Sequence, residues 1–347
     1  MLQFIAKRFG VMLLTVICLT FVVFFLTNLY PNLERLAKTQ ANNRMTDEQV
    51  ASWLSDRGYT RNVFVKYGEW LGVVPGWKKE INEVPSGRCA VKGQAPEEWP
   101  TYCGAIQGYL GDSTVFREPV SDIISKRLGL TGYLMLWTFT LMVGLALIIG
   151  ILAGMREGSK LDRGLSTFSI ATTATPEYVS GVILIVVFAS SAGGLKWFKG
   201  SASAAMDNPT FENFTLPVAT IVLYGMGYIA RMTRASMAEV MTSQYIRTAR
   251  LKGVSFPGIV IKHALRNALI APFTVIMLQF PYLLTGVVIV ETLFNYKGFG
   301  WTMVQAASNN DIELLVGVSI VAVVVVLLTQ LLSDIGYAFL NPRIRVS

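Results

Sequence analysis

The residue types that most often carry catalysis are almost absent from this 347-residue chain. His263 is the single histidine, and neither a base nor a nucleophile stands near it to complete a catalytic pair. The chain has no Gly-x4-Gly-Lys-Ser/Thr phosphate loop, so we expect it not to bind ATP itself. It also lacks His-Glu-x-x-His and Gly-x-Ser-x-Gly, which argues against a membrane protease or hydrolase. We therefore expect no enzymatic activity, and we interpret His263 as a structural or docking residue.

Cysteine is the second residue type that could do chemistry. Cys89 and Cys103 lie in one polar segment, and an oxidising compartment would favour a disulfide between them. The alternative is a metal or redox pair, but two cysteines without a nearby histidine make a poor zinc site. Cys18 lies in an apolar stretch, where we expect it to serve ordinary packing.

A strongly basic segment from Ser243 to Ala268 has the pattern of two short helices joined by a sharp turn. Ser243 can cap the first helix, and Gly253 can adopt the left-handed conformation that ends it. Pro257 suits the first turn of a second helix, which carries an apolar side. Such a hairpin can dock onto a soluble partner, or it can rest on anionic lipid headgroups.

Long uncharged stretches show which elements must position these residues. Hydrophobic residues make up 52% of the chain and charged residues only 15%, against about 25% in a typical soluble domain. About 20 apolar residues in a helix cross a bilayer core. The sequence predicts an all-α membrane protein with six transmembrane helices, at Phe9–Leu29, Thr131–Met155, Tyr178–Gly194, Phe214–Met232, Ala268–Val290 and Leu314–Tyr337. Pro272 and Pro281 are candidates for kinking the fifth span, and Gln279 between them faces either a pore or a neighbouring helix.

The short loops predict an orientation, because Lys and Arg are retained on the cytoplasmic side of a membrane. One side carries Lys7, Arg8, Arg156, Lys160, Arg163, Arg231, Arg234, Arg247, Arg250, Lys252, Lys262, Arg266, Arg343 and Arg345. The other side carries only Lys196, Lys199 and Lys297 in its short loops. We therefore expect both termini to be cytoplasmic and interpret the net charge of +8 as this bias, not as nucleic-acid binding. Because few ionisable residues fall within the spans, we expect the energy for any transport to come from outside the chain.

The segment between the first two spans is long and polar. We predict an N-terminal transmembrane helix over residues 1–30, an extracytoplasmic insert over 31–130 and a five-helix core over 131–347. The insert contains four tryptophans, which predict a small packed subdomain or an interface layer, and Thr46 with Gln49 has a capping-box pattern. A cleaved signal peptide is the alternative for the first span, but Leu29-Tyr30-Pro31 is a poor cleavage site.

Several motifs resemble one protein family along nearly the whole chain. Two motifs resemble the dipeptide/oligopeptide/nickel/opine branch of ABC importer permeases: Tyr-Ile-Arg-Thr-Ala-Arg-x-Lys-Gly, which begins at Tyr245, and His-Ala-Leu-Arg-Asn-Ala, which begins at His263. Similar to this branch are also the residues 1–8, 108–113, 231–237, 291–294, 298–300 and 341–345. The insert around Trp77–Cys103 departs from the branch pattern.

The resemblance implies a type I ABC importer permease fold in a bacterial inner membrane. It implies as partners a second homologous permease, two ATPase subunits that hold ATP and magnesium, an extracytoplasmic solute-binding protein and the lipid bilayer. The segment at about 236–267 would be the cytoplasmic coupling loop, with Gly253 at its tip, Ala249 allowing close approach to the ATPase, and Arg247 and Arg250 pairing with acidic groups. The implied coupling residues are Tyr245, Arg247, Ala249, Arg250, Gly253, His263, Leu265 and Arg266.

The function expected on these grounds is that of a permease subunit in an ATP-driven importer of peptides or related small solutes. A self-sufficient secondary carrier or channel is the alternative, and it would move solute through liposomes without ATP or partners.

Overall fold

The computed structural model describes residues 2–81, 84–91, 93–191 and 195–340. Its first half contains the helices α1 (Leu2–Thr27), α2 (Tyr30–Gln40), α3 (Asp47–Asp56), α4 (Val63–Leu71), α5 (Val120–Gly154), α6 (Lys160–Ala174) and α7 (Glu177–Phe188). It continues with α8 (Phe211–Met241), α9 (Gln244–Leu251), α10 (Phe256–Gly258), the π-helical turn Ile259–Ala264, α11 (Leu265–Ala268), α12 (Ile270–Leu293), α13 (Phe299–Ser308) and α14 (Ile312–Leu340). A two-stranded hairpin, β1 (Lys78–Ile81) with β2 (Val84–Gly87), and short 3₁₀ turns at Ala105–Gln107 and Ser203–Met206 complete the described structure. Arg343, Arg345 and the predicted closing motif at 341–345 lie outside these residues.

Four described helices are individually long and apolar enough to cross a membrane, at Ala6–Thr27, Val120–Gly154, Phe211–Met241 and Ile312–Gly336. They contain the predicted first, second, fourth and sixth spans, apart from a few residues at the ends. Two further spans are reached if each of two bent helix pairs is counted as one. The predicted all-α membrane architecture is therefore confirmed, with six as the highest number of spans.

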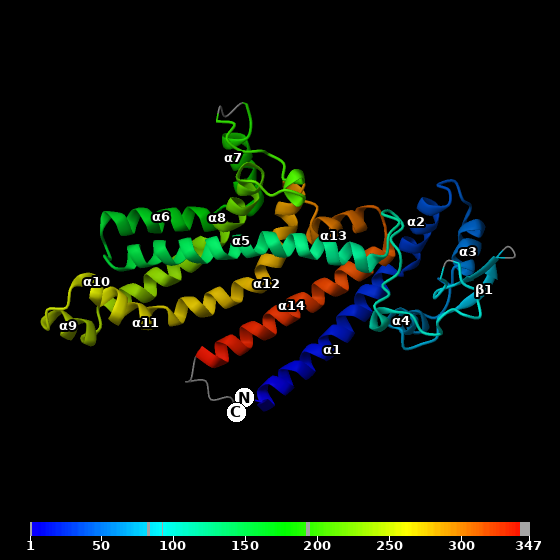
Figure 1. Ribbon diagram of the computed structural model, residues 1–347, viewed down its shortest axis with the longest axis horizontal. Helices are drawn as coiled ribbons and strands as arrows, with labels where there is room; N and C mark the ends of the chain where they lie inside the picture. Colours follow the sequence, from blue (N-terminus) through cyan, green and yellow to red (C-terminus); the bar gives the residue numbers. More distant parts are fainter. Residues whose placement is uncertain (1, 82–83, 92, 192–194, 341–347) are drawn as a thin grey trace. The chain divides into compact units, whose positions relative to one another are not determined.

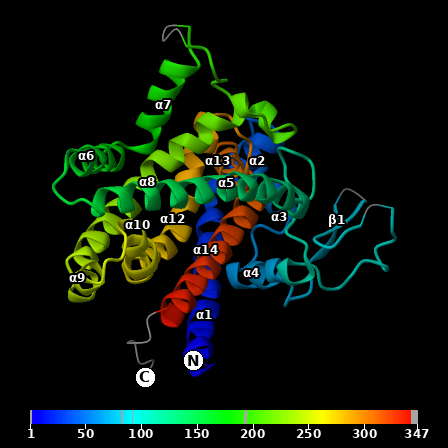
Figure 2. The same ribbon diagram turned by 60° about the vertical axis from the view of Figure 1, so that its left-hand side comes forward.

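The third predicted span was wrong in its extent. Its helix α7 has 12 residues and is only about 18 Å long, too short to cross a bilayer by itself. α7 meets α6, which we had assigned to a loop, at an angle of 107°, and Figure 2 shows the two helices diverging at this bend. The break follows from Pro176, because the residue before a proline is disfavoured in helical conformation and Thr175 is extended. Residues 192–194 of the predicted span lie outside the described structure.

The fifth span is bent by 52° at Leu269, between α11 and α12. Pro272 explains the position of this bend, because a proline has no N–H to donate to the carbonyl four residues earlier. That carbonyl belongs to Ala268, and the Ser236 hydroxyl of α8 donates to it at 2.8 Å. Pro281 lies within α12, which is assigned as one helix through it.

The chain forms two compact units. Unit 1 contains residues 1–9, 129–301 and 326–347, and unit 2 contains residues 10–128 and 302–325. The core of unit 1 is formed largely by α8, whose buried residues Leu216, Ile221 and Ile229 pack with residues of the second span and of α12. α6, α7 and α12 all pack against α8, which makes α8 the central helix of unit 1 (Figure 1).

Unit 2 has a hydrophobic core of its own. Trp70, Leu36 and Leu54 are fully buried and pack with Phe24 of α1 and Ile312 of α14. This core lies largely in the insert, where the tryptophans predicted a small packed subdomain or an interface layer, and α1 and α14 also contribute to it. The capping box is confirmed at the start of α3, where Thr46 and Gln49 satisfy each other's backbone N–H groups.

A disulfide joins Cys89 and Cys103, whose Cα atoms are 5.6 Å apart and whose side chains are buried. The bridge ties the end of the β1–β2 hairpin to the segment that leads to the second span. Cys18 is exposed on α1, within a helix long and apolar enough to cross a membrane.

Replacing both Cys89 and Cys103 with serine is expected to destabilise unit 2 by about 3 kcal/mol. The reason is that the unfolded chain gains conformational entropy when the disulfide no longer closes a loop of this size. Limited proteolysis of the chain in detergent, followed by mass spectrometry, should show faster cleavage between residues 72 and 118. Cys18→Ser is the matched control and should leave the cleavage rate unchanged. Equal rates for the double variant and the original chain would contradict the prediction.

Candidate functional site: the basic loop and the helices that carry it

The basic segment folds as predicted into a helical hairpin after α8 (Figure 1). α9 ends at Leu251, and Gly253 adopts a φ of 75°, the left-handed conformation that reverses the chain there. Pro257 lies in the first turn of α10. Ser243 precedes α9 as expected, but its hydroxyl donates to the Val240 carbonyl at 2.6 Å and does not cap the helix.

A small hydrophobic core holds this hairpin rigidly. Ile246 of α9 is fully buried against the second arm of the hairpin and the end of α8, in a cluster of Met237, Met241, Ile246, Ala249, Ile259, Val260, Ala264 and Ala268. The predicted apolar side of the second helix is thereby confirmed, with Leu265 partly buried against the cluster. Across the hairpin, the Asn267 amide donates to the Tyr245 hydroxyl at 2.9 Å.

Ala249 belongs to this core and is only 6% exposed. Its side chain therefore faces its own chain, where its small volume lets α9 lie close to the π-helical turn. The expected role of Ala249 in close approach to another subunit stays a prediction. The sequence comparison had aligned the residue with a family motif without showing which side of the helix it occupies.

The remaining predicted residues of the hairpin lie on its surface. Exposed side chains or backbone are found at Tyr245, Arg247, Arg250, Gly253, His263 and Arg266. Sequence reasoning missed Leu251, which is 82% exposed at the end of α9, between two basic residues. A large apolar side chain in that position contributes little to the core of this chain. Its isolation in a charged segment was the signal that could have identified it.

A cavity of about 570 Å³ lies beside the hairpin. The end of α5 and the loop after it contribute Arg156 and Glu157, and the hairpin contributes Arg247 and Arg250. Three arginines therefore line one hollow, which favours acidic groups of a partner or of a ligand.

Arg234 connects this region to α6. Its Nε and Nη2 atoms donate to the two carboxylate oxygens of Asp162 at 3.0 and 2.8 Å, a bidentate pair. The Asp162 side chain is almost completely buried and also accepts from the Gly158 N–H. Glu157 lies 3.5 Å from Arg234 but is mostly exposed. The pair fixes α6 against α8, just before α8 enters the hairpin.

Gln279, the candidate pore residue, lines a cavity of about 300 Å³ between α8 and α12. Tyr224 and Tyr228 of α8 face Tyr282 of α12 across it, and the hydroxyls of Tyr224 and Tyr282 are 2.5 Å apart. The half-exposed side chains of Tyr228 and Tyr282 give the middle of these two helices a polar surface. Among the described residues, no group of three His, Cys, Asp or Glu side chains could hold a metal ion.

Residues 146–346 match the family model described as binding-protein-dependent transport system inner membrane component. The chain belongs to this family. As a member of it, the chain is an inner-membrane permease subunit of a binding-protein-dependent transport system. The matched range includes the hairpin, the Arg234–Asp162 pair and the cavity at Gln279.

Relatives of this permease differ in how much of the chain they match. A protein of Sinorhizobium fredii named as a probable peptide ABC transporter permease is 36% identical over 69% of this chain and 77% of its own. The glutathione transport system permease protein of Escherichia coli is 33% identical over 71% of this chain and 78% of its own. A Brucella suis protein named as a peptide permease is 27% identical over the whole of both chains. That last match extends over the insert.

A second family motif in the permease organises the start of α13. Glu291 is fully buried and accepts hydrogen bonds from the Thr131 hydroxyl and from the Trp301 N–H, the latter at 2.9 Å. Thr131 in turn accepts from the Phe299 N–H at 2.8 Å. A Cβ on Gly298 would lie 2.2 Å from the Glu291 carboxylate, which explains the glycine in this motif.

Proposed function

We propose that this permease is half of the membrane pore of an ATP-driven ABC importer for peptides, and that the hairpin receives the movement of a separate ATPase subunit. The names of the Sinorhizobium and Escherichia relatives support peptides and glutathione as the substrate class. In this proposal ATP and magnesium bind to two ATPase subunits, a second homologous permease completes the pore, and a solute-binding protein delivers the substrate.

The main support for the proposal is the connection of the hairpin to two membrane helices. α8 leads into the hairpin and α12 leads out of it, and the Ser236–Ala268 hydrogen bond joins α8 to the end of α11, just before α12 begins. The same two helices line the cavity at Gln279 and Tyr224. Tyr228 and Met241 are 13 residues apart in α8, which corresponds to about 20 Å along the helix. A displacement of the hairpin would therefore reach the cavity through two continuous helices.

The proposed orientation places the hairpin and both termini in the cytoplasm. The concentration of Lys and Arg in the short loops on the side of the hairpin supports it. Tyr245, Arg247, Arg250, Leu251, His263 and Arg266 would form the docking surface, and Gln279 would line the translocation path.

Replacing residues 243–266 with a Gly/Ser linker of equal length is expected to abolish co-purification of the ATPase subunits and ATP-dependent uptake. The reason is that the linker keeps the connection between the spans but removes the rigid docking surface. Affinity purification from membranes, with quantification of the ATPase by mass spectrometry, measures the first effect, and peptide uptake into proteoliposomes measures the second.

The matched control replaces the β1–β2 hairpin, residues 78–87, with a linker of the same kind and should retain the ATPase. Retention of the ATPase by the 243–266 variant would contradict the proposal. Uptake by the purified permease alone, without ATP or partners, would favour a self-sufficient carrier instead.

A further inference from the structure

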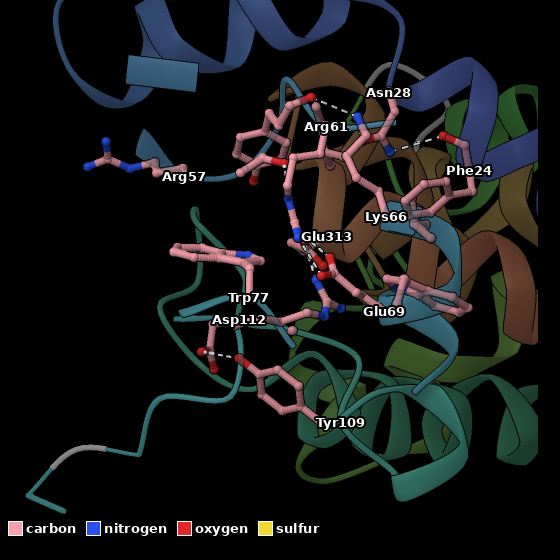
Figure 3. Close-up of a pocket in the computed structure, with 17 residues that line it drawn as sticks. Phe24, Asn28, Arg57, Arg61, Lys66, Glu69, Trp77, Tyr109, Asp112 and Glu313 are labelled. Atoms are coloured by element: carbon pink, nitrogen blue, oxygen red, sulfur yellow. Dashed lines mark hydrogen bonds and ion pairs between the residues drawn. The ribbon is translucent and has the colours of Figure 1, made fainter. Parts of the chain in front are cut away.

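A cavity of about 230 Å³ lies within unit 2, formed by the insert together with residues of α1 and α14 (Figure 3). Its volume corresponds to roughly eight water molecules at ~30 Å³ each. Aromatic side chains make up much of its wall, from Phe24, Tyr59, Trp70, Trp77 and Tyr109. The cavity is separate from the hairpin and from the cavity at Gln279, and none of the functions above uses it.

Most charged groups of this cavity already have partners. These are the bidentate pair of Arg61 with Glu69, Lys66 bound to Asn28 and to the Tyr59 carbonyl, Asp112 bound to the Tyr109 hydroxyl, and Arg57 stacked over Trp53. Burial, aided by the charge of Arg61, lowers the pKa of Lys66. Where the wall of the cavity is buried, polar atoms without a partner are costly.

Three of its lining side chains carry buried polar atoms with no hydrogen-bond partner in the described part of the chain. They are the Trp70 Nε1, the Arg88 Nε and Nη2, and the Glu313 Oε2. Trp70 is only 1% exposed. The Arg88 Nη1 and the Glu313 Oε1 are 4.0 Å apart, so the two side chains form one loose ion pair that leaves the other atoms unused.

The unpaired atoms of Arg88 define a ligand geometry. Nε and Nη2 form one edge of the guanidinium group, and the same edge of Arg234 binds the two oxygens of Asp162. A carboxylate is thus the group that this edge binds bidentately. Glu313 offers an acceptor for an ammonium group next to it, and the Trp70 N–H offers one further donor.

A motif that the sequence comparison had singled out without a role leaves room for the Glu313 side chain. In the segment 108–113, Gly111 has a φ of 91°, and a Cβ there would lie 2.5 Å from the Glu313 Oε2. Tyr109 and Asp112 of the same segment line the cavity. The motif therefore lines the cavity next to the unpaired Oε2 of Glu313.

We propose that this cavity binds a free α-amino acid, with its carboxylate on Arg88, its ammonium group on Glu313 and an apolar side chain against the aromatic wall. An α-amino acid carries both charges on one carbon, which suits two protein charges only 4.0 Å apart. A peptide carries them at its opposite ends and suits the cavity less well. This site is additional to the translocation path and does not depend on the proposed ATPase coupling.

Leucine and two analogues test the proposal on the full chain in lipid nanodiscs. 4-Methylpentanoate lacks the ammonium group and 3-methylbutylamine lacks the carboxylate, while both keep the side chain. Isothermal titration should show binding of leucine and at least tenfold weaker binding of either analogue, because each loses one charge-assisted contact. Trp70 and Trp77 line the cavity, so tryptophan fluorescence provides a second measurement of the same binding.

Arg88→Gln and Glu313→Gln are each expected to weaken leucine binding at least tenfold. The exposed residues Arg44 and Glu97 allow matched controls, and Arg44→Gln and Glu97→Gln should bind as the original chain does. Thermal unfolding of each variant shows whether it has folded, and the analogue series on the unmodified chain does not depend on any variant. Absence of leucine binding, or equal binding of leucine and both analogues, would show that the unpaired atoms are hydrated and would overturn the proposal.

Discussion

Replacing Leu251 with aspartate is expected to weaken binding of the proposed ATPase subunits about 100-fold and to abolish ATP-dependent uptake. Leu251 is 82% exposed at the tip of a rigid hairpin, so a partner that docks there buries a side chain that this chain leaves in solvent. Burial of a leucine contributes about 1.5–3 kcal/mol, and a carboxylate placed in the same interface adds a desolvation cost. A loss of about 3 kcal/mol corresponds to roughly 100-fold in affinity.

Quantitative pull-down of ATPase subunits by the detergent-solubilised permease measures this effect. Leu251→Met keeps an apolar side chain of similar volume and should reduce binding less than threefold. Val84→Asp introduces the same charge at an exposed position of β2 and should have no effect. Since Leu251 contributes little to the core, all three variants should unfold at the same temperature. Normal ATPase binding by the aspartate variant would exclude Leu251 from the docking surface.

Asp162→Ala should cause the largest loss of stability in unit 1, about 3–5 kcal/mol, because it leaves the Arg234 guanidinium without its bidentate partner in a partly buried site. The substitution also removes the acceptor of the Gly158 N–H at the start of α6. The expected result is a lower unfolding temperature in detergent and increased hydrogen exchange in α6.

Glu157→Ala is the matched control for this effect. Glu157 also lies near Arg234, but its side chain is 55% exposed, so its loss should cost less than about 1 kcal/mol. The double variant Asp162→Ala with Arg234→Ala should be more stable than Asp162→Ala alone, because no unpaired guanidinium group remains. Equal unfolding temperatures for the Asp162 and Glu157 variants would show that the pair does not fix α6.

Features that depend on a few neighbouring residues were predictable from the sequence. The left-handed conformation of Gly253, the first-turn position of Pro257 and the capping box at Thr46 all follow from the chemistry of a short segment. Four of the spans could be predicted for a related reason, since length and apolarity alone distinguish a membrane helix. The basic hairpin was recognisable because the glycine and proline that mark its turn and its many basic residues occur within one short stretch.

Features that join distant segments could not be predicted in this way. Asp162 and Arg234 are 72 residues apart, and no local pattern indicates that they pair. The cavity of unit 2 brings Arg88 to Glu313 across most of the chain. The third span, predicted from Tyr178 to Gly194, was wrong in its extent because its helix ends at Phe188 and the helix before the 107° turn at Pro176 is too polar to be recognised as part of a span. Ala249 and Leu251 show a further limit, because only the packed hairpin reveals which of the two faces outward.

The hydrogen bond from Ser236 to Ala268 ties α8 to the end of α11, at the bend that precedes α12. Because Pro272 frees that carbonyl from its own helix, the fifth span can bend there without losing a backbone hydrogen bond, and the bend is held by its neighbour. A displacement of the hairpin would then move α8 and α12 together, and the tyrosine-lined cavity lies further along these two helices. Ser236 would thus influence how far these helices move, although it contacts neither the nucleotide nor the substrate.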